Sequence, residues 1–327
     1  MKFTKMHGIG NDYIYISCFD EDVSELLKDM EIYAPRLCDR HEGIGADGIV
    51  LIMESGSADF RMRMFNADGS EGRMCGNASR CVGKYVYEKG LTDKTVLALE
   101  TASGIKTLTL YPEHGKIRTV RVDMGGFSLK PEDVPAKTAD LTELPYPVTC
   151  VSVGNPHAVV FMDSLEELEN LNLEETGPVF EHSKAFPEGV NTEFVYVNAP
   201  VLVEEKADRG LKAPEVAGTE IFGEEKADRG LKIEEKADRG LKVRVWERGS
   251  GETYACGTGA CAAVIAAVKN GYFADDGGCV RTVFIKGGGA LEINVYGNTV
   301  AMTGSAQTVY DGEFRLENYG DMERSGL

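Results

Sequence analysis

Short apolar segments separated by polar, glycine-containing turns fill the first part of the chain. Where apolar and polar residues alternate, or a short apolar run lies between turn residues, the pattern predicts a β-strand. The strands predicted in this way cover residues 3–6, 13–16, 49–53, 60–65, 95–101, 104–111 and 117–124. Two stretches, 23–33 and 78–88, have helical spacing instead, and Gly90 provides a stop signal for the second.

The rest of the chain is also rich in predicted strands. They cover residues 148–153, 158–161, 194–197, 243–246, 279–285, 290–296, 299–303 and 306–314. Residues 165–173 and 262–268 have helical spacing, and Asn270-Gly271 would end the second of these helices. Gly125-Gly126 and the proline-bearing segment 131–147 indicate a passage between two domains.

A nine-residue unit, Glu-Glu-Lys-Ala-Asp-Arg-Gly-Leu-Lys, occurs three times without change, at 204–212, 224–232 and 234–242. The unit has no apolar stripe and no net charge, and it is too short for a solenoid repeat. We therefore expect a solvated insertion at 200–242 between two hairpin strands, which chain entropy tolerates well. A peptide-docking or tag-like role is the alternative.

Composition narrows the class of protein. A chain of 327 residues with 43% hydrophobic and 27% charged content predicts a globular protein of about two domains. The net charge of -18 argues against nucleic-acid and anionic-membrane partners. The eight cysteines include no Cys-x-x-Cys pair, which leaves zinc ribbons unsupported. No signal-peptide or membrane-length apolar run is present, so we expect a cytoplasmic protein with reduced thiols.

Two polar, glycine-containing loops each lead to a cysteine at the start of a predicted helix. Cys75 and Cys256 are both followed by a glycine, and in both cases another glycine ends the helix 15 residues later, at Gly90 and Gly271. A Gly-Ser pair precedes each cysteine, and a second cysteine follows each within the helix. Two such copies, about half a chain apart, predict two structurally similar halves.

A cysteine at the start of a helix can act as a reactive thiolate next to a bound anion. The first N–H groups of a helix have no partner within the helix, and they lower a thiol pKa and bind anions. The alternative for each cysteine is simple packing, since free cysteine is often buried. Two opposed thiols would serve as two bases that invert a stereocentre, while the helix starts stabilise the developing carbanion through its carboxylate.

Several longer motifs accompany these cysteines. They are His7-Gly8-Ile9-Gly10-Asn11-Asp12, Phe65 to Glu71, Cys75-Gly76-Asn77, Gly154-Asn155-Pro156-His157, Gly189 to Phe194, Glu247 to Thr253 and Ala255 to Gly259. Together they resemble the diaminopimelate epimerase family over almost the whole chain outside 200–242. The resemblance implies cofactor-independent epimerisation of LL-2,6-diaminopimelate to meso-diaminopimelate, a step of lysine and peptidoglycan precursor biosynthesis. It implies no metal and, as is frequent in the family, a homodimer.

The resemblance also implies a fold. We expect an α/β (α+β) protein of two pseudo-symmetric halves, each a curled, mixed or antiparallel sheet around a central helix, with the active site in the cleft between them. One half would comprise residues 1–126, completed by the tail 306–327. The other would comprise residues 127–305, including the insertion.

Site residues follow from the same resemblance. Cys75 and Cys256 would be the two bases, with Cys75 taking the proton from the LL isomer. Asn11, Asn66, Asn155 and Asn191 would bind the distal end and polar groups of the substrate, and Glu247 and Arg248 its distal ammonium and carboxylate. Gly76, Asn77, Gly257 and Thr258 would hydrogen-bond the α-carboxylate, and His157 and Glu247 would tune the reacting centre. The alternatives are turn asparagines, a loop histidine and a surface Glu–Arg pair.

Two departures and two other functions stay open at this point. Gly48 stands where many members carry a glutamine that contacts substrate, and Ala78-Ser79 replaces the commoner Gly-Ala or Gly-Ile. A proline or hydroxyproline racemase is the alternative enzyme, because it shares the fold and the cysteine pair. A redox-responsive binding protein, with a Cys75–Cys256 disulfide, is the alternative from another class.

Overall fold

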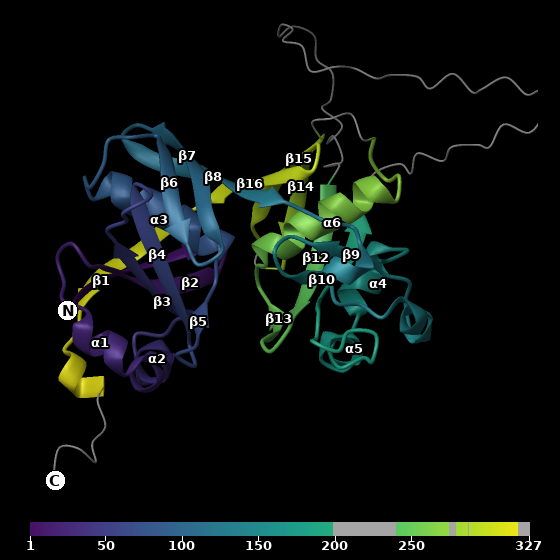
Figure 1. The fold of residues 1–327 in the computed structure, drawn as a ribbon, viewed down its shortest axis with the longest axis horizontal. Helices are drawn as coiled ribbons and strands as arrows, with labels where there is room; N and C mark the ends of the chain where they lie inside the picture. Colours follow the sequence, from purple (N-terminus) through teal and green to yellow (C-terminus); the bar gives the residue numbers. More distant parts are fainter. Residues whose placement is uncertain (199–239, 275–278, 287, 320–327) are drawn as a thin grey trace, which may run out of the picture.

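The computed structural model describes residues 1–198, 240–274, 279–286 and 288–319. Within them, seventeen strands form one hydrogen-bonded system. Figure 1 shows two halves side by side, one around helix α3 and one around helix α6. Most of the predicted insertion at 200–242 lies outside the described residues, including the first two copies of the repeat.

The first half contains eight strands and three helices. They are β1 (Lys2–Gly8), β2 (Asn11–Ser17), α1 (Ser24–Lys28), α2 (Met30–Cys38), β3 (Gly48–Met53), β4 (Phe60–Asn66), β5 (Glu71–Gly72), α3 (Gly76–Glu88), β6 (Val96–Thr101), β7 (Gly104–Glu113) and β8 (Lys116–Gly126). Two 3-10 turns, η1 (Pro131–Asp133) and η2 (Thr138–Glu143), lie in the passage to the second half.

The second half repeats this order. Its elements are β9 (Thr149–Ser152), β10 (Pro156–Phe161), α4 (Leu165–Asn170), α5 (Leu173–Glu181), β11 (Asn191–Val197), β12 (Gly240–Glu247), β13 (Gly251–Thr253), α6 (Gly257–Lys269), β14 (Cys279–Ile285), β15 (Ala290–Tyr296) and β16 (Thr299–Ser305). Strand β17 (Gln307–Glu313) and the 3-10 turn η3 (Leu316–Tyr319) follow.

Strand pairing is the same in both halves. In the first, β2 pairs parallel with β3, β3 antiparallel with β4, and β4 parallel with β6. In the second, β10 pairs parallel with β11, β11 antiparallel with β12, and β12 parallel with β14. The expected α/β class with two pseudo-symmetric halves is therefore confirmed.

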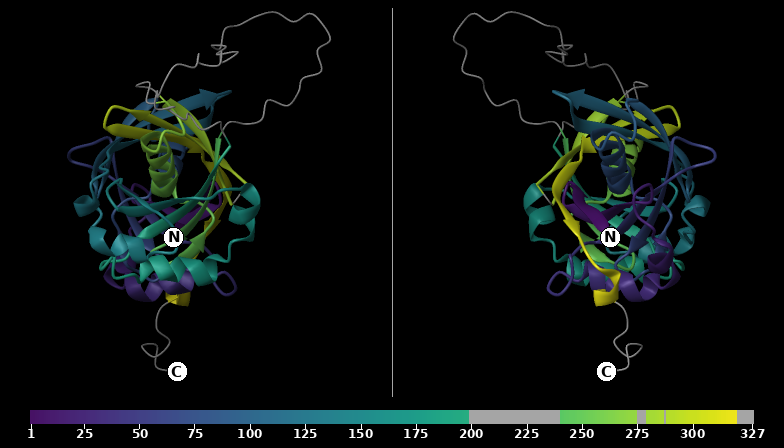
Figure 2. Two further views of the ribbon diagram at one scale, coloured as in Figure 1. Left: turned by 90° about the vertical axis from the view of Figure 1, so that its right-hand side faces the viewer. Right: turned by 90° about the vertical axis from the view of Figure 1, so that its left-hand side faces the viewer.

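The halves are joined by strands that are far apart in sequence. β16 pairs antiparallel with β8, and β17 returns to pair with β1 at the N-terminus. Figure 2 shows α6 within its surrounding strands in one view and α3 in the other.

The face of the sheet on which a strand residue lies decides which apolar cluster it joins. Inward-facing residues pack around the two central helices in one continuous cluster that includes Val82 of α3, Val264 of α6 and Met302 of β16. Outward-facing residues of the same strands form two further clusters, one under α1 and α2 with Ile14, the other under α4 and α5 with Phe194. Because both faces are covered, the central strands read as near-continuous apolar runs.

Two predicted helices are corrected. The helix expected over 23–33 breaks at Asp29, whose backbone is not helical, and α2 then continues to Cys38. The helix expected over 165–173 ends at Asn170, and α5 follows as a separate helix that the sequence did not indicate. Gly177 within α5 is a residue type that usually interrupts a helix. Here a Cβ at Gly177 would overlap the ring of Trp246, so glycine at this position allows α5 to pack closely against β12.

The strand expected to begin at Val243 begins three residues earlier. Gly240, Leu241 and Lys242 belong to the third repeat copy, yet they pair with β11 and β14 as the start of β12. Leu241 is fully buried. The end of that copy is therefore part of the sheet, because its leucine continues the inward-facing apolar positions of β12.

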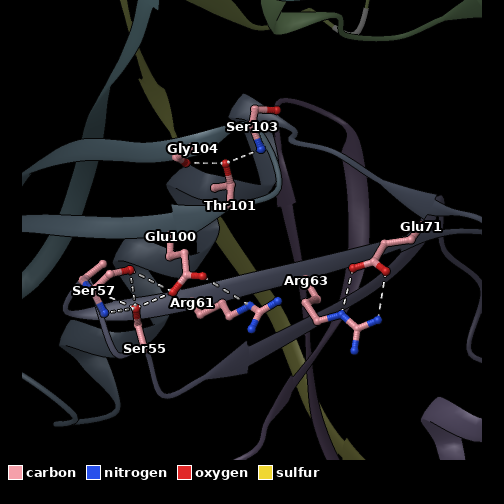
Figure 3. A network of polar contacts seen from close by, with 10 residues as sticks. Ser55, Ser57, Arg61, Arg63, Glu71, Glu100, Thr101, Ser103 and Gly104 are labelled. Carbon is pink, nitrogen blue, oxygen red and sulfur yellow. Dashed lines mark hydrogen bonds and ion pairs between the residues drawn. The ribbon is translucent and has the colours of Figure 1, made fainter.

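An ion pair supports each cysteine loop at an equivalent position. Arg63 of β4 donates two hydrogen bonds, of 2.8 and 2.9 Å, to Glu71 of β5, in the network of Figure 3. Arg244 of β12 donates a hydrogen bond of 2.8 Å to Glu252 of β13. Since both glutamates precede the cysteine of their half by four residues, these pairs fix the loop that leads to each thiol.

Candidate active site

Cys75 is the N-cap residue of α3. Its backbone is extended, and its Sγ accepts a hydrogen bond of 3.5 Å from the N–H of Ala78. The thiol lies 3.4 Å from Oδ1 of Asn11 on β2. Burial raises the pKa of the Cys75 thiol, and the N–H groups of Ala78 and Asn77 and the hydroxyl of Tyr13 oppose that rise. The sequence prediction of a thiol at a helix start is therefore met at this position.

Cys256 has the same place on α6. Its Sγ accepts a hydrogen bond of 3.4 Å from the N–H of Gly259 and lies 3.5 Å from Oγ1 of Thr258. Burial, followed by the carboxylates of Glu247 and Glu193, raises the pKa of Cys256 well above its usual range. The two thiols are therefore alike in backbone geometry but not in electrostatic surroundings.

One amide group links the two helix starts. Nδ2 of Asn77, the second residue of α3, donates to the carbonyl of Ala255, directly before Cys256, at 3.1 Å. It also donates to Oδ1 of Asn11 at 3.2 Å, the oxygen that faces Cys75. The structure therefore brings Cys75, Asn11, Asn77 and the Cys256 loop together, although Asn77 and Ala255 are 178 positions apart along the chain.

Met302 of β16 packs against both helix starts. A Cβ added at Gly76 would lie 2.5 Å from its Cε, and one added at Gly257 would lie 3.0 Å from its Sδ. Met302 itself is fully buried. Glycine after each cysteine therefore lets one shared side chain pack closely against both helix starts, besides leaving the helix N–H groups open to an anion.

Asn11 is held by charged residues behind it. Its Nδ2 donates to Oδ2 of Asp47 at 2.8 Å, and Arg40 bridges Asp47 and Asp12 at 2.8 and 2.7 Å. Burial opposes ionisation of Asp12, but Arg40 and Lys5 outweigh it and lower the pKa of Asp12. This anchoring leaves the Oδ1 of Asn11 turned toward Cys75.

His157 and Glu193 form a buried pair next to Cys256. Nδ1 of His157 lies 2.7 Å from Oε1 of Glu193, and both side chains are fully buried. Nε2 of His157 lies 3.0 Å from Oδ1 of Asn155, whose Nδ2 donates to Oγ1 of Thr258 at 3.3 Å. A Cβ at Gly259 would lie 2.6 Å from Oε1 of Glu193, which places this carboxylate directly against the start of α6.

Glu247 ends β12 at the same site. Its Oε1 accepts a hydrogen bond of 2.5 Å from the hydroxyl of Thr253. Burial raises the pKa of Glu247, while Thr253 and His157 oppose that rise. Its charge also raises the thiol pKa of both Cys75 and Cys256.

Three other predicted site residues have partners of a more structural kind. Asn66 is exposed and donates to Oγ of Ser70 at 3.0 Å. Asn191 donates to the Pro156 carbonyl at 3.0 Å and accepts from the N–H of Arg248 at 3.0 Å. The guanidinium of Arg248 donates to the carbonyl of Glu188 at 2.7 Å. A substrate that bound these groups would have to compete with the hydrogen bonds to Ser70, Pro156 and Glu188.

The two departures from the family pattern have structural reasons. A Cβ at Gly48 would overlap the carbonyl oxygen of Phe65 and lie 2.9 Å from the ring of Tyr13. This backbone therefore has no room for a side chain at position 48. Ala78 and Ser79 are fully buried, and the Ser79 hydroxyl donates to the Cys75 carbonyl at 2.9 Å, so Ser79 supports the helix start.

Several neighbours of the site were not singled out from the sequence. Tyr13, Glu193 and Met302 lie in apolar strands, where a side chain's contacts depend on strand register. Glu193 carried a signal, because a carboxylate between Thr192 and Phe194 in a buried strand needs a partner. Arg80, which is fully buried on α3, carried the same signal and donates to the Ser305 carbonyl at 3.1 Å.

The remaining described cysteines are unpaired. Cys81 and Cys261 are fully buried, Cys38 and Cys150 are largely buried, and Cys75 and Cys256 form no disulfide in this structure. Within the described residues, no three His, Cys, Asp or Glu side chains converge as a metal site would require. No helix in that part of the chain is long and apolar enough to cross a membrane.

Solved structures share this fold at low sequence identity. A PhzF-family phenazine biosynthesis protein from Bacillus anthracis aligns with a TM-score of 0.64 at 16% identity, covering 96% of this chain and 99% of that one. A probable proline racemase from Agrobacterium radiobacter gives a TM-score of 0.61 at 16% identity, covering 98% and 94%. These likenesses concern the two-half fold alone.

Sequence relatives are much closer. Diaminopimelate epimerase from Acetivibrio thermocellus is 44% identical over 326 residues, covering 97% of this chain and 99% of the relative. The enzyme of the same name from Methanococcus maripaludis is 43% identical over 326 residues, covering 97% and 100%. The family model described as diaminopimelate epimerase matches residues 3–130 and 198–309. The chain belongs to the diaminopimelate epimerase family.

Proposed function

We propose that this protein epimerises LL-2,6-diaminopimelate to meso-diaminopimelate without a cofactor, with Cys75 and Cys256 as its two bases. The observation that carries the proposal is the pair of thiol N-caps on α3 and α6, whose helix starts are linked by Asn77 through the Ala255 carbonyl at 3.1 Å. Two relatives named diaminopimelate epimerase, 44% and 43% identical over 97% of this chain, support the choice of substrate.

The reaction needs one thiolate and one thiol at a time. The Cys75 thiolate removes the α-proton of the LL isomer, and the Cys256 thiol delivers a proton to the opposite face of the carbanion. One proton is gained by Cys75 and one is lost by Cys256, so the reverse reaction uses them in exchanged roles. Cys256 is the thiol that stays protonated at rest, because burial and then the carboxylates of Glu247 and Glu193 raise its pKa well above the usual range.

The helix starts supply the electrostatic part of catalysis. The N–H groups of Gly76, Asn77, Gly257 and Thr258 face outward at the two N-termini, where they would bind the α-carboxylate and stabilise the charge that develops next to it. This stabilisation is stronger in a site that excludes water, and Cys256 is almost fully buried.

The rest of the substrate would extend away from the cysteines. Asn11 and Asn155 border the reacting centre, and His157 and Glu247 tune it. Asn11, Asn66, Asn155 and Asn191 would bind the distal amino-acid end and polar groups of the substrate, and Glu247 and Arg248 its distal ammonium and carboxylate. Binding there would replace the hydrogen bonds that Asn66 and Arg248 make with Ser70 and Glu188.

We also propose two domains: residues 1–126 completed by the tail 306–327, and residues 127–305. Pairing of β17 with β1 supports assigning the tail to the first half. We infer a homodimer, as in the family, and a cytoplasmic location, where the paired thiols stay reduced.

Two single variants test the proposed mechanism. Cys75→Ala and Cys256→Ala should each lower the rate of LL/meso interconversion by about a thousandfold, because each removes one proton-transfer group. The rate is followed by chiral chromatography of the two isomers, with α-deuterium uptake from heavy water as a second readout. Full interconversion by Cys75→Ala would refute the two-base mechanism.

The chain offers matched controls. Cys81 and Cys261 lie on the same two helices but are fully buried in the core. Cys81→Ala and Cys261→Ala should keep the rate within about threefold, because they touch neither the substrate nor the helix start. L-Proline offered as substrate should show no deuterium uptake; uptake would favour the racemase alternative.

A further inference from the structure

Arg80 of α3 is the largest side chain that is completely buried among the described residues. Its Nε donates to the carbonyl of Ser305 at 3.1 Å, and its Nη1 lies 3.5 Å from Sδ of Met302, which is a weak acceptor. Its Nη2 has no hydrogen-bond partner within the described part of the chain. Because a buried charge normally has an ionic partner, this guanidinium requires an explanation.

The guanidinium lies directly behind the two helix starts. Its Nη1 contacts Met302 of β16, the strand that joins the two halves in Figure 1. A Cβ at Gly76 would lie 2.5 Å from Cε of Met302, and a Cβ at Gly257 would lie 3.0 Å from its Sδ. One thioether therefore separates the cation from the first residues of both α3 and α6.

Two glycines make room for this side chain. A Cβ at Gly304 of β16 would lie 3.1 Å from Nε of Arg80 and 3.2 Å from its Cζ. A Cβ at Gly8 of β1 would lie 2.9 Å from Nη2 of Arg80 and 3.1 Å from the backbone oxygen of Asn77. The unpartnered Nη2 and the second residue of α3 therefore face the same glycine, at the turn that carries Asn11.

One cation is shared by the two halves. Arg80 follows Cys75 by five positions, and Cys261 follows Cys256 by five, so the same helix position holds arginine in α3 and cysteine in α6. Burial lowers the pKa of Arg80, and the groups that favour its charge are the thiols of Cys81, Cys75 and Cys261 and the phenol of Tyr15. These groups are neutral when protonated, so the positive charge is left without a permanent counter-ion.

We propose that Arg80 is a positioning residue that supplies, from behind Met302, the buried positive charge for a carboxylate held at the starts of α3 and α6. The inference deepens the proposed function, in which these helix starts bind the α-carboxylate of the substrate. One negative charge is present there before proton removal and a second develops in the carbanion, so the attraction to Arg80 is strongest in the transition state. Water screens it little, because Arg80 is fully buried.

Two alkylating reagents that differ in charge test for this cation without substrate. Iodoacetate carries a carboxylate next to the carbon that a thiolate attacks, whereas iodoacetamide is neutral. Both reagents need the thiolate, so the ratio of their rates at one cysteine cancels the thiolate fraction and reports the local potential. Reduced full-length protein is treated at neutral pH, and Cys75 and Cys256 are followed separately by peptide mass spectrometry.

Arg80→Met removes the charge and keeps a long, unbranched side chain. It should lower the iodoacetate-to-iodoacetamide ratio about tenfold at Cys75 and about threefold at Cys256. Arg80→Gln, a second neutral variant that keeps a donor for the Ser305 carbonyl, should lower the ratio in the same way. Arg80→Lys keeps the charge and should stay within about twofold of the wild-type ratio.

The same helix offers a matched control. Lys84 is the other buried cation of α3, one turn further along, and its Nζ pairs with Oε1 of Glu88 at 2.5 Å. The double variant Lys84→Gln/Glu88→Gln removes this buried cation together with its partner. It should leave the ratio unchanged at both cysteines, because the charge of Lys84 is already compensated.

Two outcomes would overturn the proposal. One is an unchanged ratio in the neutral Arg80 variants, including equal slowing by both reagents, which would show that Arg80 only maintains packing. The other is an equal loss of the ratio in the Lys84/Glu88 control. Urea denaturation shows which variants are folded, and Arg80→Gln and Arg80→Lys decide the question if Arg80→Met is not. Because alkylation requires no diaminopimelate, failure of this proposal and failure of the epimerase proposal are distinguishable.

Discussion

At the scale of single residues, the site depends on small groups placed against sulfur. Each thiol accepts an N–H at the start of its helix and lies within 3.5 Å of a side-chain oxygen, that of Asn11 for Cys75 and that of Thr258 for Cys256. Tyr13 adds a hydroxyl on the Cys75 side that lowers the thiol pKa against the effect of burial. The reactivity of the two cysteines can therefore be changed one at a time.

Tyr13→Phe should make the thiol of Cys75 harder to deprotonate. The substitution removes the hydroxyl and keeps the ring, so the pKa of Cys75 rises further and alkylation at neutral pH slows by about three- to tenfold. Peptide mass spectrometry after iodoacetamide treatment measures the effect, and Cys256 in the same molecule is the control. Equal slowing at both cysteines would show that Tyr13 acts through general packing instead.

Gly48→Ala should lower the free energy of unfolding although it adds only one methyl group. The new Cβ would overlap the Phe65 carbonyl oxygen and push on the ring of Tyr13, so we expect a loss of about 2–3 kcal/mol in unfolding free energy. Gly56→Ala is the matched control, because nothing lies within 4 Å of a Cβ there. Urea denaturation compares the two; similar small losses would contradict the predicted overlap.

At the scale of elements, the same unit occurs twice: a strand, a short return strand, a loop and a helix that begins at cysteine. An arginine–glutamate pair braces the loop each time, but the environments differ. The side chains of Arg63 and Glu71 are 27% and 41% exposed, whereas those of Arg244 and Glu252 are 18% and 9% exposed. Glu252 also pairs with Lys286 at 2.7 Å.

Glu252→Gln should therefore destabilise the protein more than Glu71→Gln. We expect a loss of about 2 kcal/mol for Glu252→Gln and less than about 1 kcal/mol for Glu71→Gln at neutral pH, since charge pairs gain weight as they are buried. Burial opposes ionisation of Glu252, but Arg244 and Lys286 outweigh it and lower its pKa. Its contribution is thus present above about pH 4.5 and lost as pH falls through the lowered value. Denaturation at pH 7 and pH 4 tests this; a difference that persists unchanged at the lower pH would contradict it.

At the scale of the whole molecule, one apolar core surrounds both central helices and two further clusters lie under the outer helices, and all three contain thiols as packing groups. Burial raises the pKa of Cys81 and Cys150 to about 11, and that of Cys38 and Cys261 to about 12. These thiols stay protonated in the folded chain at pH values where they ionise in the unfolded chain.

Stability should consequently fall on the alkaline side. A folded pKa above the unfolded value of about 9 gives a contribution that is complete below that pH and is lost as pH rises toward 11 or 12. Each buried thiol should cost about 1 kcal/mol between pH 9 and pH 10. Urea denaturation with reductant at pH 8, 9 and 10 gives the slope. The double variant Cys81→Ala/Cys261→Ala should have a shallower one, and an unchanged slope would exclude these thiols as its source.

The sequence by itself determined what depends on neighbours along the chain. Glycine-rich loops, helix-start cysteines and alternating apolar residues are local signals, so both thiols, most strands and the repeated half could be predicted. The sequence did not predict the helix breaks at Asp29 and after Asn170, or the helix that includes Gly177. Packing against distant residues overrides the local helix preference at these positions.

Only the tertiary structure decided how the thiols differ. The pairing of His157 with Glu193, the link from Asn77 to Ala255 and the position of Met302 between two glycines join residues on different elements. Each depends on strand register, and a shift of one residue would turn Glu193 away from α6. Local sequence specifies that a cysteine starts each helix, whereas the charge and hydrogen bonds behind each cysteine arise only when the strands of the sheet are aligned.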